Sequence, residues 1–186
     1  MIGYAFCGSF CTHEASLAQL SRLISTGYDV LPIMSETVFS TDTRFGTAQQ
    51  LQSRVRELCK KEIIHTIVGA EPLGPKISLE ALVICPCTGN TLAKMAHGIT
   101  DTAVTMAAKA HLRGDRPIVV SLASNDALSA NMKNIAQLLS RKHVYFVPMT
   151  QDDPVSKPHS LVANFELLLP TLESALSGKQ YQKVFM

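Results

Sequence analysis

The sequence predicts an α/β protein in which one parallel sheet lies between two layers of helices. Short apolar runs alternate with longer amphipathic segments along the whole 186-residue chain. The run ALVIC at 81–85 is continuously apolar, as expected of a strand that is buried on both faces. Because neither a repeat nor a flexible linker interrupts this pattern, we expect a single domain over 1–180 and a short C-terminal tail at 181–186.

Hydrophobic periodicity assigns the individual elements. Short apolar runs predict strands at residues 2–8, 29–35, 81–85, 117–123 and 143–148. Apolar residues at helical spacing predict helices at residues 12–26, 47–61, 91–97, 101–112, 131–141 and 160–176. In the first helix Leu17, Leu20 and Leu23 share one face, and Gly27 follows in the manner of a C-cap. In the last helix Pro170 predicts a kink or a break.

Three connecting segments and the tail have weaker patterns. The run EIIHTIV at 62–68 fits either a strand or a helix. Prolines predict loops at 71–76 and 151–158. The tail is expected to be mobile or to reach toward a neighbouring protomer.

Composition limits the class of protein. With 46% hydrophobic and 17% charged residues the chain is apolar, so we expect a homo-oligomer or a partner to cover the surplus. A net charge of +2 without a basic cluster gives no indication of nucleic-acid binding. No apolar run approaches the roughly 18 residues of a bilayer span, and the N-terminus lacks the pattern of a signal peptide. We therefore expect a cytoplasmic protein.

The five cysteines are expected to be reduced and buried, because their number is odd and most lie in apolar runs. Cys85 and Cys87 lack the two-residue spacer of zinc and redox motifs, and the histidines show no ligand spacing. His97 and His111 fall on predicted helices and are expected to have surface or core roles. We expect no metal site.

Ligands of parallel α/β sheets bind at the carboxyl ends of the strands, where the topology switches. Four loops follow predicted strands here, at residues 8–12, 35–44, 86–91 and 124–131. In the first loop Gly8, Ser9 and Thr12 offer backbone N–H groups, hydroxyls and a helix N-terminus to a phosphate. The alternative is a capped turn, since Ser and Thr are favoured caps. Neither a Walker loop nor a dinucleotide fingerprint is present.

The third loop, CTGNT, has the same kind of chemistry. Thr88, Asn90 and Thr91 can donate hydrogen bonds to an anion or to ring carbonyls, and Gly89 lets backbone approach a ligand closely. Helix capping explains part of this composition, but not four small polar residues in succession. A phosphate cradle and a capped turn both fit the loop.

The second and fourth loops could recognise a substrate. The second is rich in hydroxyls, among them Thr37, and carries Arg44, which could bind a phosphate or carboxylate unless the loop is merely solvated. In the fourth, Asn125 and Asp126 follow a buried strand, and Asp126 is either an acid–base group or the cap of a turn. No set of nucleophile, base and orienting group is visible, so the catalytic residues stay unidentified. A hydroxyl-rich cleft of this kind suits a phosphate-bearing cofactor such as flavin mononucleotide (FMN).

The stretch PCTGNTLAKMAHGITD at 86–101 resembles a long signature of the flavoprotein family that includes phosphopantothenoylcysteine decarboxylase, lantibiotic cysteine decarboxylases and flavin prenyltransferase. The matching positions are Pro86, Thr88, Asn90, Thr91, Ala93, Lys94, Ala96, Gly98, Ile99 and Asp101. The resemblance implies a Rossmann-like flavoprotein fold, bound FMN, and assembly as a trimer or a multiple of trimers. The residues assigned to the cofactor are Gly8, Ser9, Thr37, Thr88, Asn90 and Thr91.

Further stretches resemble one branch of this family. They are TDTRFG (41–46), AEPLGPK (70–76), SLASNDALSANMKNI (121–135), YFVPMTQDDPVSKPHSLVA (145–163) and LESALSGKQ (172–180). This resemblance implies a chain that acts with a second, NAD(P)-binding subunit to oxidise a dihydropyridine dicarboxylate to pyridine-2,6-dicarboxylate. That product is the calcium-chelating acid of bacterial endospores, which implies the mother cell of a sporulating bacterium. Arg44 and Asn125 are the candidate substrate-binding residues.

The sequence also departs from other branches of the family. Pro72 stands where cysteine decarboxylases carry a histidine, and His65 lies too far upstream to replace it. The decarboxylase substrate motif and the Arg–Glu pair of the prenyltransferase are missing from 122–128. These departures weigh against decarboxylation and prenyl transfer. The alternatives kept open are a free-standing FMN-dependent decarboxylase and a flavin-free scaffold for the partner subunit.

Overall fold

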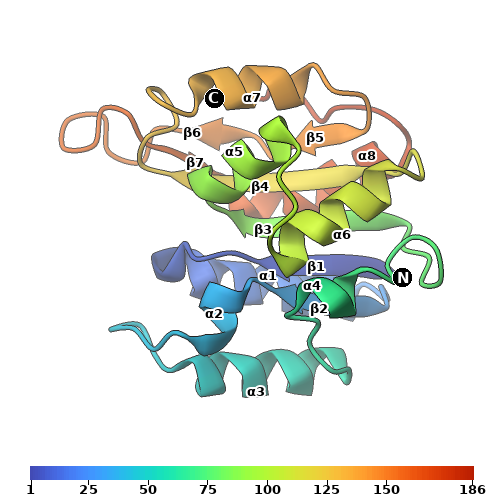
Figure 1. The fold of residues 1–186 in the computed structure, drawn as a ribbon. Coiled ribbons are helices and arrows are strands. Elements are labelled where there is room, and N and C mark those ends of the chain that lie inside the picture. Colours follow the sequence, from blue (N-terminus) through green and yellow to red (C-terminus); the bar gives the residue numbers. More distant parts are fainter.

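A computed structural model describes residues 1–186, and its centre is a sheet whose main strands are parallel (Figure 1). These strands are β1 (Ile2–Phe6), β2 (Val30–Met34), β3 (Ala81–Cys87), β4 (Ile118–Ser124) and β5 (Val144–Phe146). Their order is β2-β1-β3-β4, with β5 alongside the first half of β4. Every residue of β3 and β4 is buried, which confirms strands covered on both faces.

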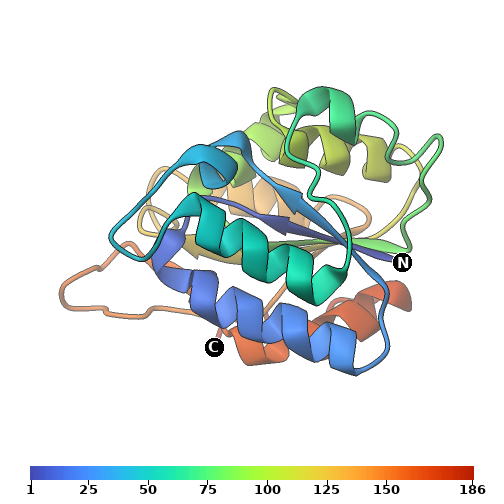
Figure 2. The same ribbon diagram turned by 90° about the horizontal axis from the view of Figure 1, so that it is seen from below.

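Helices cover both faces of the sheet, as Figures 1 and 2 show. One layer contains α1 (His13–Ser25), α3 (Ala48–Cys59) and α8 (Leu168–Leu176). The other contains α4 (Ile67–Ala70), α5 (Gly89–His97), α6 (Ala103–Leu112) and α7 (Met132–Leu139). Each layer buries its own apolar cluster against the sheet, so the three-layer prediction is confirmed. None of these helices combines the length and the apolar character that crossing a bilayer requires.

The sheet is not purely parallel, which corrects the sequence prediction. β7 (Leu161–Ala163) pairs antiparallel with the end of β4, and β6 (Met149–Thr150) pairs antiparallel with β7. The helix predicted over 160–176 therefore begins only at Leu168, after a 3₁₀ turn at Phe165–Leu167. Pro170 neither kinks nor breaks it, because it lies in the first helical turn, where a missing N–H leaves no carbonyl unpaired.

Two connecting segments also differ from expectation. The loop predicted at 35–44 contains a short helix, α2 (Glu36–Ser40), whose N-cap Ser35 accepts a hydrogen bond from the Val38 N–H. The ambiguous segment 62–68 divides between a bridge from Ile64 to Ile33 of β2 and the start of α4. The segments 71–76 and 151–158 contain no helix and no strand, as predicted.

The C-terminal tail lies along β6 of the same chain. The Met149 N–H donates to the Val184 carbonyl at 2.8 Å, and the Met186 N–H donates to the Met149 carbonyl at 3.1 Å. The Gln180 side chain is bonded to both the N–H and the carbonyl of Phe146. These contacts place the tail against the sheet edge, rather than free of the chain as the sequence suggested.

The buried side chains include titratable groups. Four of the five cysteines are buried and Cys11 is exposed, which corrects the expectation for that one residue. His97 lies at the surface, whereas His111 is only 3% exposed, and its Nε2 lies 2.9 Å from the Pro117 carbonyl. Burial lowers the pKa of His111 to about 4. This histidine is therefore neutral in the folded protein at neutral pH.

Acid should destabilise the protein through His111. The unfolded imidazole titrates near 6.5 and the folded one at about 4, so in this window the unfolded chain binds more protons and the free energy of unfolding falls as the pH falls. The difference corresponds to roughly 3 kcal/mol at most. His111→Gln, which can still donate to Pro117, should lose less stability between pH 7 and pH 4.5 in urea unfolding. Equal losses in wild type, His111→Gln and the surface control His97→Gln would contradict this account.

Candidate functional site

The strand order reverses between β1 and β3. Two of the predicted loops follow these two strands and lie side by side at their carboxyl ends. The chain moves from β1 outward to β2, and from β3 outward to β4 on the opposite side. The Cys7 N–H donates to the Pro86 carbonyl at 3.2 Å, and the Thr91 hydroxyl lies 3.3 Å from the Cys7 sulfur. The loops at 8–12 and 86–91 are therefore neighbours at the topological switch point, where α/β sheets bind ligands.

The first loop uses some of its polar groups within the fold and leaves others unpaired. The Thr12 hydroxyl donates to the Ser9 carbonyl at 2.8 Å, and the Ser9 N–H donates to the Cys7 carbonyl at 2.9 Å. Ser9 and Thr12 stand at the N-caps of a 3₁₀ turn (Phe10–Thr12) and of α1, yet neither side chain makes a capping hydrogen bond. The backbone N–H of Gly8 has no backbone or side-chain acceptor. His13 holds the loop in place, because its Nε2 lies 2.9 Å from the Cys7 carbonyl. The turn interpretation accounts for Thr12, whereas the Gly8 N–H and the Ser9 hydroxyl are the donors of this loop that remain available to an anion.

In the third loop some polar groups bond to the protein itself, and others have no partner and are available to a ligand. The Thr88 hydroxyl caps α5 by accepting from the Thr91 N–H at 3.2 Å, and the Thr91 side chain is buried against Cys7. Asn90 is exposed. Gly89 and Asn90 open the helix, so their N–H groups have no carbonyl partner within it. The two threonine side chains thus shape the loop, and the backbone of Gly89 and Asn90 supplies the donors.

The signature helix α5 is stabilised at both ends. Gly98 ends it in the left-handed region at φ 72°, where glycine is favoured, and the Ile99 N–H donates to the Lys94 carbonyl. Lys94 forms an ion pair with Asp101 at 2.8 Å, and this hydrogen bond lowers the pKa of the Asp101 carboxyl. Lys94 therefore has a structural partner and is not directed to a ligand.

The second loop is more ordered than a solvated loop. The Glu36 carboxylate accepts from the Ala103 N–H at 3.1 Å and so caps α6 from a distance in sequence. The Asp42 carboxylate accepts from the Ala48 N–H at the start of α3. Thr37 is exposed in the first turn of α2. Arg44 is exposed, and its guanidinium carbon lies 4.8 Å from the centre of the Phe45 ring.

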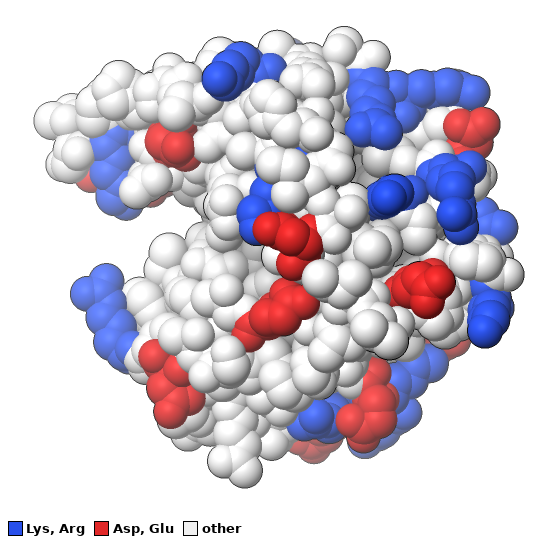
Figure 3. All heavy atoms as spheres, in the orientation of Figure 1, with Lys and Arg blue, Asp and Glu red and all other residues white.

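The surface is hollowed at this edge of the sheet (Figure 3), between two arms formed by the segments 41–47 and 150–160. Each arm carries one basic residue, Arg44 on the first and Lys157 on the second. Lys157 is paired with Asp152 at 2.8 Å, whereas Arg44 forms no ion pair. Arg44 is therefore the arm residue whose positive charge is free for an anionic ligand.

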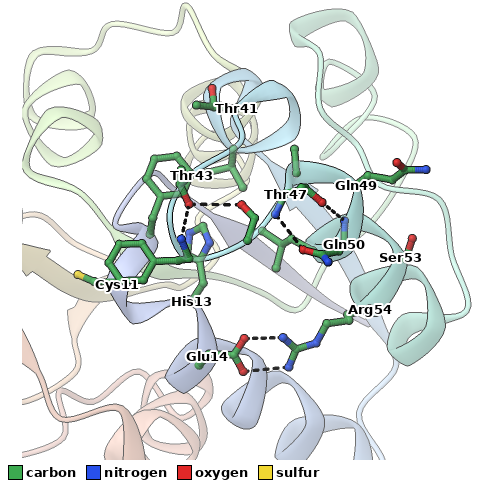
Figure 4. Close-up of a pocket in the computed structure, with 16 residues that line it drawn as sticks. Cys11, His13, Glu14, Thr41, Thr43, Thr47, Gln49, Gln50, Ser53 and Arg54 are labelled. Carbon is green, nitrogen blue, oxygen red and sulfur yellow. Dashed lines mark hydrogen bonds and ion pairs between the residues drawn. The ribbon is translucent and has the colours of Figure 1, made fainter.

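A cavity of about 730 Å³ adjoins the first loop on the side of α1 and α3 (Figure 4). Cys11, Thr43 and Gln50 are among its lining residues, and the bidentate pair of Glu14 and Arg54 closes one side. None of the eight residues predicted to bind the cofactor or the substrate lines this cavity. Most of the residues that line the cavity are neutral and polar. Part of its wall comes from the loop 8–12 and the stretch 41–46, but sequence reasoning missed the cavity because the side chains of α1 and α3 that complete it come together only in the folded chain.

The fourth loop meets the third. Asn125 is exposed at the end of β4, without a hydrogen bond from its side chain. The Asp126 carboxylate accepts hydrogen bonds from Ser124 and Asn131, and these bonds lower its pKa. An ionised carboxylate with its oxygens occupied is a poor general acid, so the acid–base reading of Asp126 is not supported. Its backbone carbonyl accepts from Ser129 and Asn131, which fits the turn interpretation.

The donor set at the switch point suits a phosphate group. It combines the N–H groups of Gly8, Gly89 and Asn90 with the Ser9 hydroxyl and the positive end of the nine-residue helix α5. No lysine or arginine is needed for such a site, because backbone amides and the helix dipole supply the positive potential. The fold and this donor set define the class of the protein: a Rossmann-like α/β protein with unpaired hydrogen-bond donors at its switch point, where proteins of this class bind ligands.

The chain belongs to the Flavoprotein family, whose model matches residues 2–164. It is 44% identical over 185 residues to the B subunit of dipicolinate synthase of Bacillus subtilis (strain 168), covering 100% of this chain and 92% of that protein. Its structure superposes with a TM-score of 0.92 on the crystal structure of the dipicolinate synthase B subunit from Bacillus halodurans, at 43% identity, covering 100% and 95% of the two chains.

More distant relatives share the fold. The FMN-dependent cysteine decarboxylase SpaF matches with a TM-score of 0.70 at 21% identity, covering 95% of this chain and 94% of that one. Pro72, which stands where the sequence pattern of cysteine decarboxylases has a histidine, is half-buried between α4 and β3. His65 is stacked on Phe39 of α2, with ring centres 3.6 Å apart.

Proposed function

We propose that this chain is the B subunit of a dipicolinate synthase, which acts with the A subunit of that enzyme to oxidise dihydrodipicolinate to dipicolinate during endospore formation. The full-length similarity to two B subunits, at 44% and 43% identity, supports this function. The single structural observation that carries the cofactor assignment is the set of unpaired donors at the switch point. Such a set fits the phosphate of FMN.

In this proposal the first and third loops bind FMN. Gly8 and Ser9 of the first loop, and the backbone of Gly89 and Asn90 at the start of α5, would hold its phosphate. Thr88 and Thr91 hold the third loop in shape. Thr37, which is exposed in the helix α2 that follows β2, would be a further ligand of the cofactor. When bound, FMN supplies redox chemistry that no side chain of this protein offers.

The substrate is a dianion, so its binding needs a fixed cation. Arg44 meets this need, because it projects from an arm of the hollow without an ion pair, and its planar fork matches a carboxylate. Asn125, exposed at the end of β4, can bind the same substrate with its amide. The reaction removes a hydride and a proton from the dihydropyridine ring, and NAD(P) on the A subunit is the final hydride acceptor.

The assembly proposed here has two levels. Both close relatives are named as B subunits, which supports a partner, and we propose that this partner is the NAD(P)-binding A subunit of dipicolinate synthase. Exposed apolar side chains such as Val68, which is 79% exposed, support a homo-oligomer, proposed as a trimer or a multiple of trimers. The proposed location is the cytoplasm of the mother cell.

Co-purification with the A subunit tests this function. We expect one complex whose visible spectrum contains bound flavin and which reduces NADP when dihydrodipicolinate is added. A complex that is colourless, and stays so after incubation with FMN, would favour a flavin-free scaffold. Turnover of a carboxylate substrate by this chain alone would favour the free-standing decarboxylase.

A further inference from the structure

The fourth loop contains a carboxylate that is held from several sides. The Asp126 Oδ1 accepts from the Ser124 hydroxyl at 2.5 Å and from the Asn131 side-chain nitrogen at 2.9 Å. The same nitrogen lies 2.9 Å from Oδ2. Asn131 stands at the N-cap of α7, yet its side chain makes no capping bond there. The Asn131 side chain therefore binds the Asp126 carboxylate instead of capping α7.

The third loop rests directly on this group. A Cβ atom at Gly89 would lie 2.4 Å from the Ser124 Oγ, 2.6 Å from the Asn131 nitrogen and 2.8 Å from the Asp126 Oδ1. Distances below 3.0 Å leave no room for a methyl group, so the backbone of Gly89 is packed closely against all three side chains. The carboxylate thus lies against Gly89, the first residue of α5, where its negative charge also complements the positive end of the helix dipole.

The hydrogen bonds of this cluster run in one direction. Because an ionised carboxylate only accepts, Asn131 must turn its nitrogen toward Asp126 and its oxygen away. That oxygen accepts from the Asn134 side-chain nitrogen at 2.8 Å, and the Asn134 oxygen is left buried without a donor. An unpaired buried oxygen is costly. The cluster therefore keeps its orientation at the expense of local stability, which indicates a role beyond the stability of the turn.

We propose that Asp126 is a positioning residue of the FMN site: together with Ser124 and Asn131 it fixes Gly89, and so aims the N–H groups of Gly89 and Asn90 at the cofactor phosphate. This inference rests on the proposed function. Asp126 acts through Gly89 and does not touch the phosphate itself.

Whether Asp126→Asn binds FMN more weakly or more tightly than wild type separates the positioning role from a purely electrostatic one. Asp126→Asn keeps the size of the side chain and removes a negative charge close to a dianionic phosphate. If the charge alone mattered, FMN would bind more tightly to the variant, because a like charge has been removed. If Asp126 positions the cradle, FMN binds more weakly, because the amide has a single oxygen and its NH2 group would face the Asn131 nitrogen, which in the wild type donates to both Oδ1 and Oδ2.

The experiment is a fluorescence titration of the purified full-length chain with FMN and, in parallel, with riboflavin, which lacks the phosphate. We expect Asp126→Asn to weaken FMN binding at least tenfold and to leave riboflavin binding within twofold of wild type. Ser124→Ala, which keeps the charge and removes one donor, should shift FMN binding in the same direction by a smaller factor. Asp115→Asn, a carboxylate at the opposite end of the parallel strands, should change neither.

Tighter FMN binding by Asp126→Asn, or equal losses for FMN and riboflavin, would overturn the positioning role while the proposed function stands. If Asp126→Asn does not fold, Ser124→Ala decides by the same criterion. A wild-type chain that binds no FMN would overturn this inference together with the cofactor assignment, and the wild-type titration identifies that case.

Discussion

Gly89→Ala is expected to weaken FMN binding at least a hundredfold. The added methyl group would lie 2.4 to 2.8 Å from side-chain atoms of Ser124, Asp126 and Asn131, between the end of β4 and the start of α7. Ser124 is buried and Asn131 is fixed by Asp126, so neither can move aside easily. The start of α5 must shift instead, and its N–H donors then leave the phosphate position. Titration with FMN measures the loss directly.

The same substitution should also lower the free energy of unfolding by ~1–3 kcal/mol, the usual cost of overpacking a well-packed site. Gly114→Ala is the matched control, because a Cβ atom there would lie 3.5 Å from its nearest neighbour, the His111 carbonyl oxygen. The control should bind FMN as wild type does. An FMN affinity of Gly89→Ala within threefold of wild type would show that the cradle at α5 is not the phosphate site.

Arg44→Ala is expected to reduce kcat/KM for dihydrodipicolinate about a hundredfold in the reconstituted complex, with folding intact. Arg44 is exposed and packs only on the Phe45 ring, so its removal costs the fold little. A hundredfold loss corresponds to ~2.7 kcal/mol of transition-state stabilisation, the scale expected for one charge-assisted contact to a carboxylate. Arg44→Lys should recover only part of the loss, because an ammonium group cannot form the paired contact.

Arg113→Ala is the matched control for Arg44, because Arg113 is also exposed and without an ion pair but lies after α6, at the opposite end of the parallel strands. Steady-state kinetics with thermal melting compares the three variants. Unchanged kcat/KM in Arg44→Ala would remove Arg44 from the substrate site without affecting the FMN assignment.

The parallel core of the fold could be predicted because its strands are buried on both faces. β3 and β4 are continuous apolar runs, and helices with one apolar face alternate with them. β7 could not be predicted in this way: three residues, with Leu161 and Ala163 buried, also fit the first turn of an apolar helix. Residues 161–163 form a strand because they pair with the free edge of β4, a partner that exists only in the folded chain.

The sequence indicated the two loops that the structure brings together, but only part of what their side chains do in the fold. Residue types and the strand ends indicated both loops of the cradle. They could not indicate that Thr88 and Thr91 turn toward the protein, or that Gly89 is required by the side chains behind it. Those roles depend on contacts with β1, β4 and α7, which come from distant parts of the chain. The ligand-binding roles of all eight residues stay predictions: Gly8, Ser9, Thr37, Arg44, Thr88, Asn90, Thr91 and Asn125.

This chain and the A subunit of dipicolinate synthase should oxidise dihydrodipicolinate only together. The most direct test is the initial rate of NADP reduction with dihydrodipicolinate, measured for this chain alone, for the isolated A subunit, and for the two mixed at equal concentration in the presence of FMN. The proposal predicts a rate in the mixture at least a hundredfold above the sum of the separate rates, and loss of this gain with Gly89→Ala. A mixture no faster than the isolated A subunit, or full activity of either protein by itself, would contradict it.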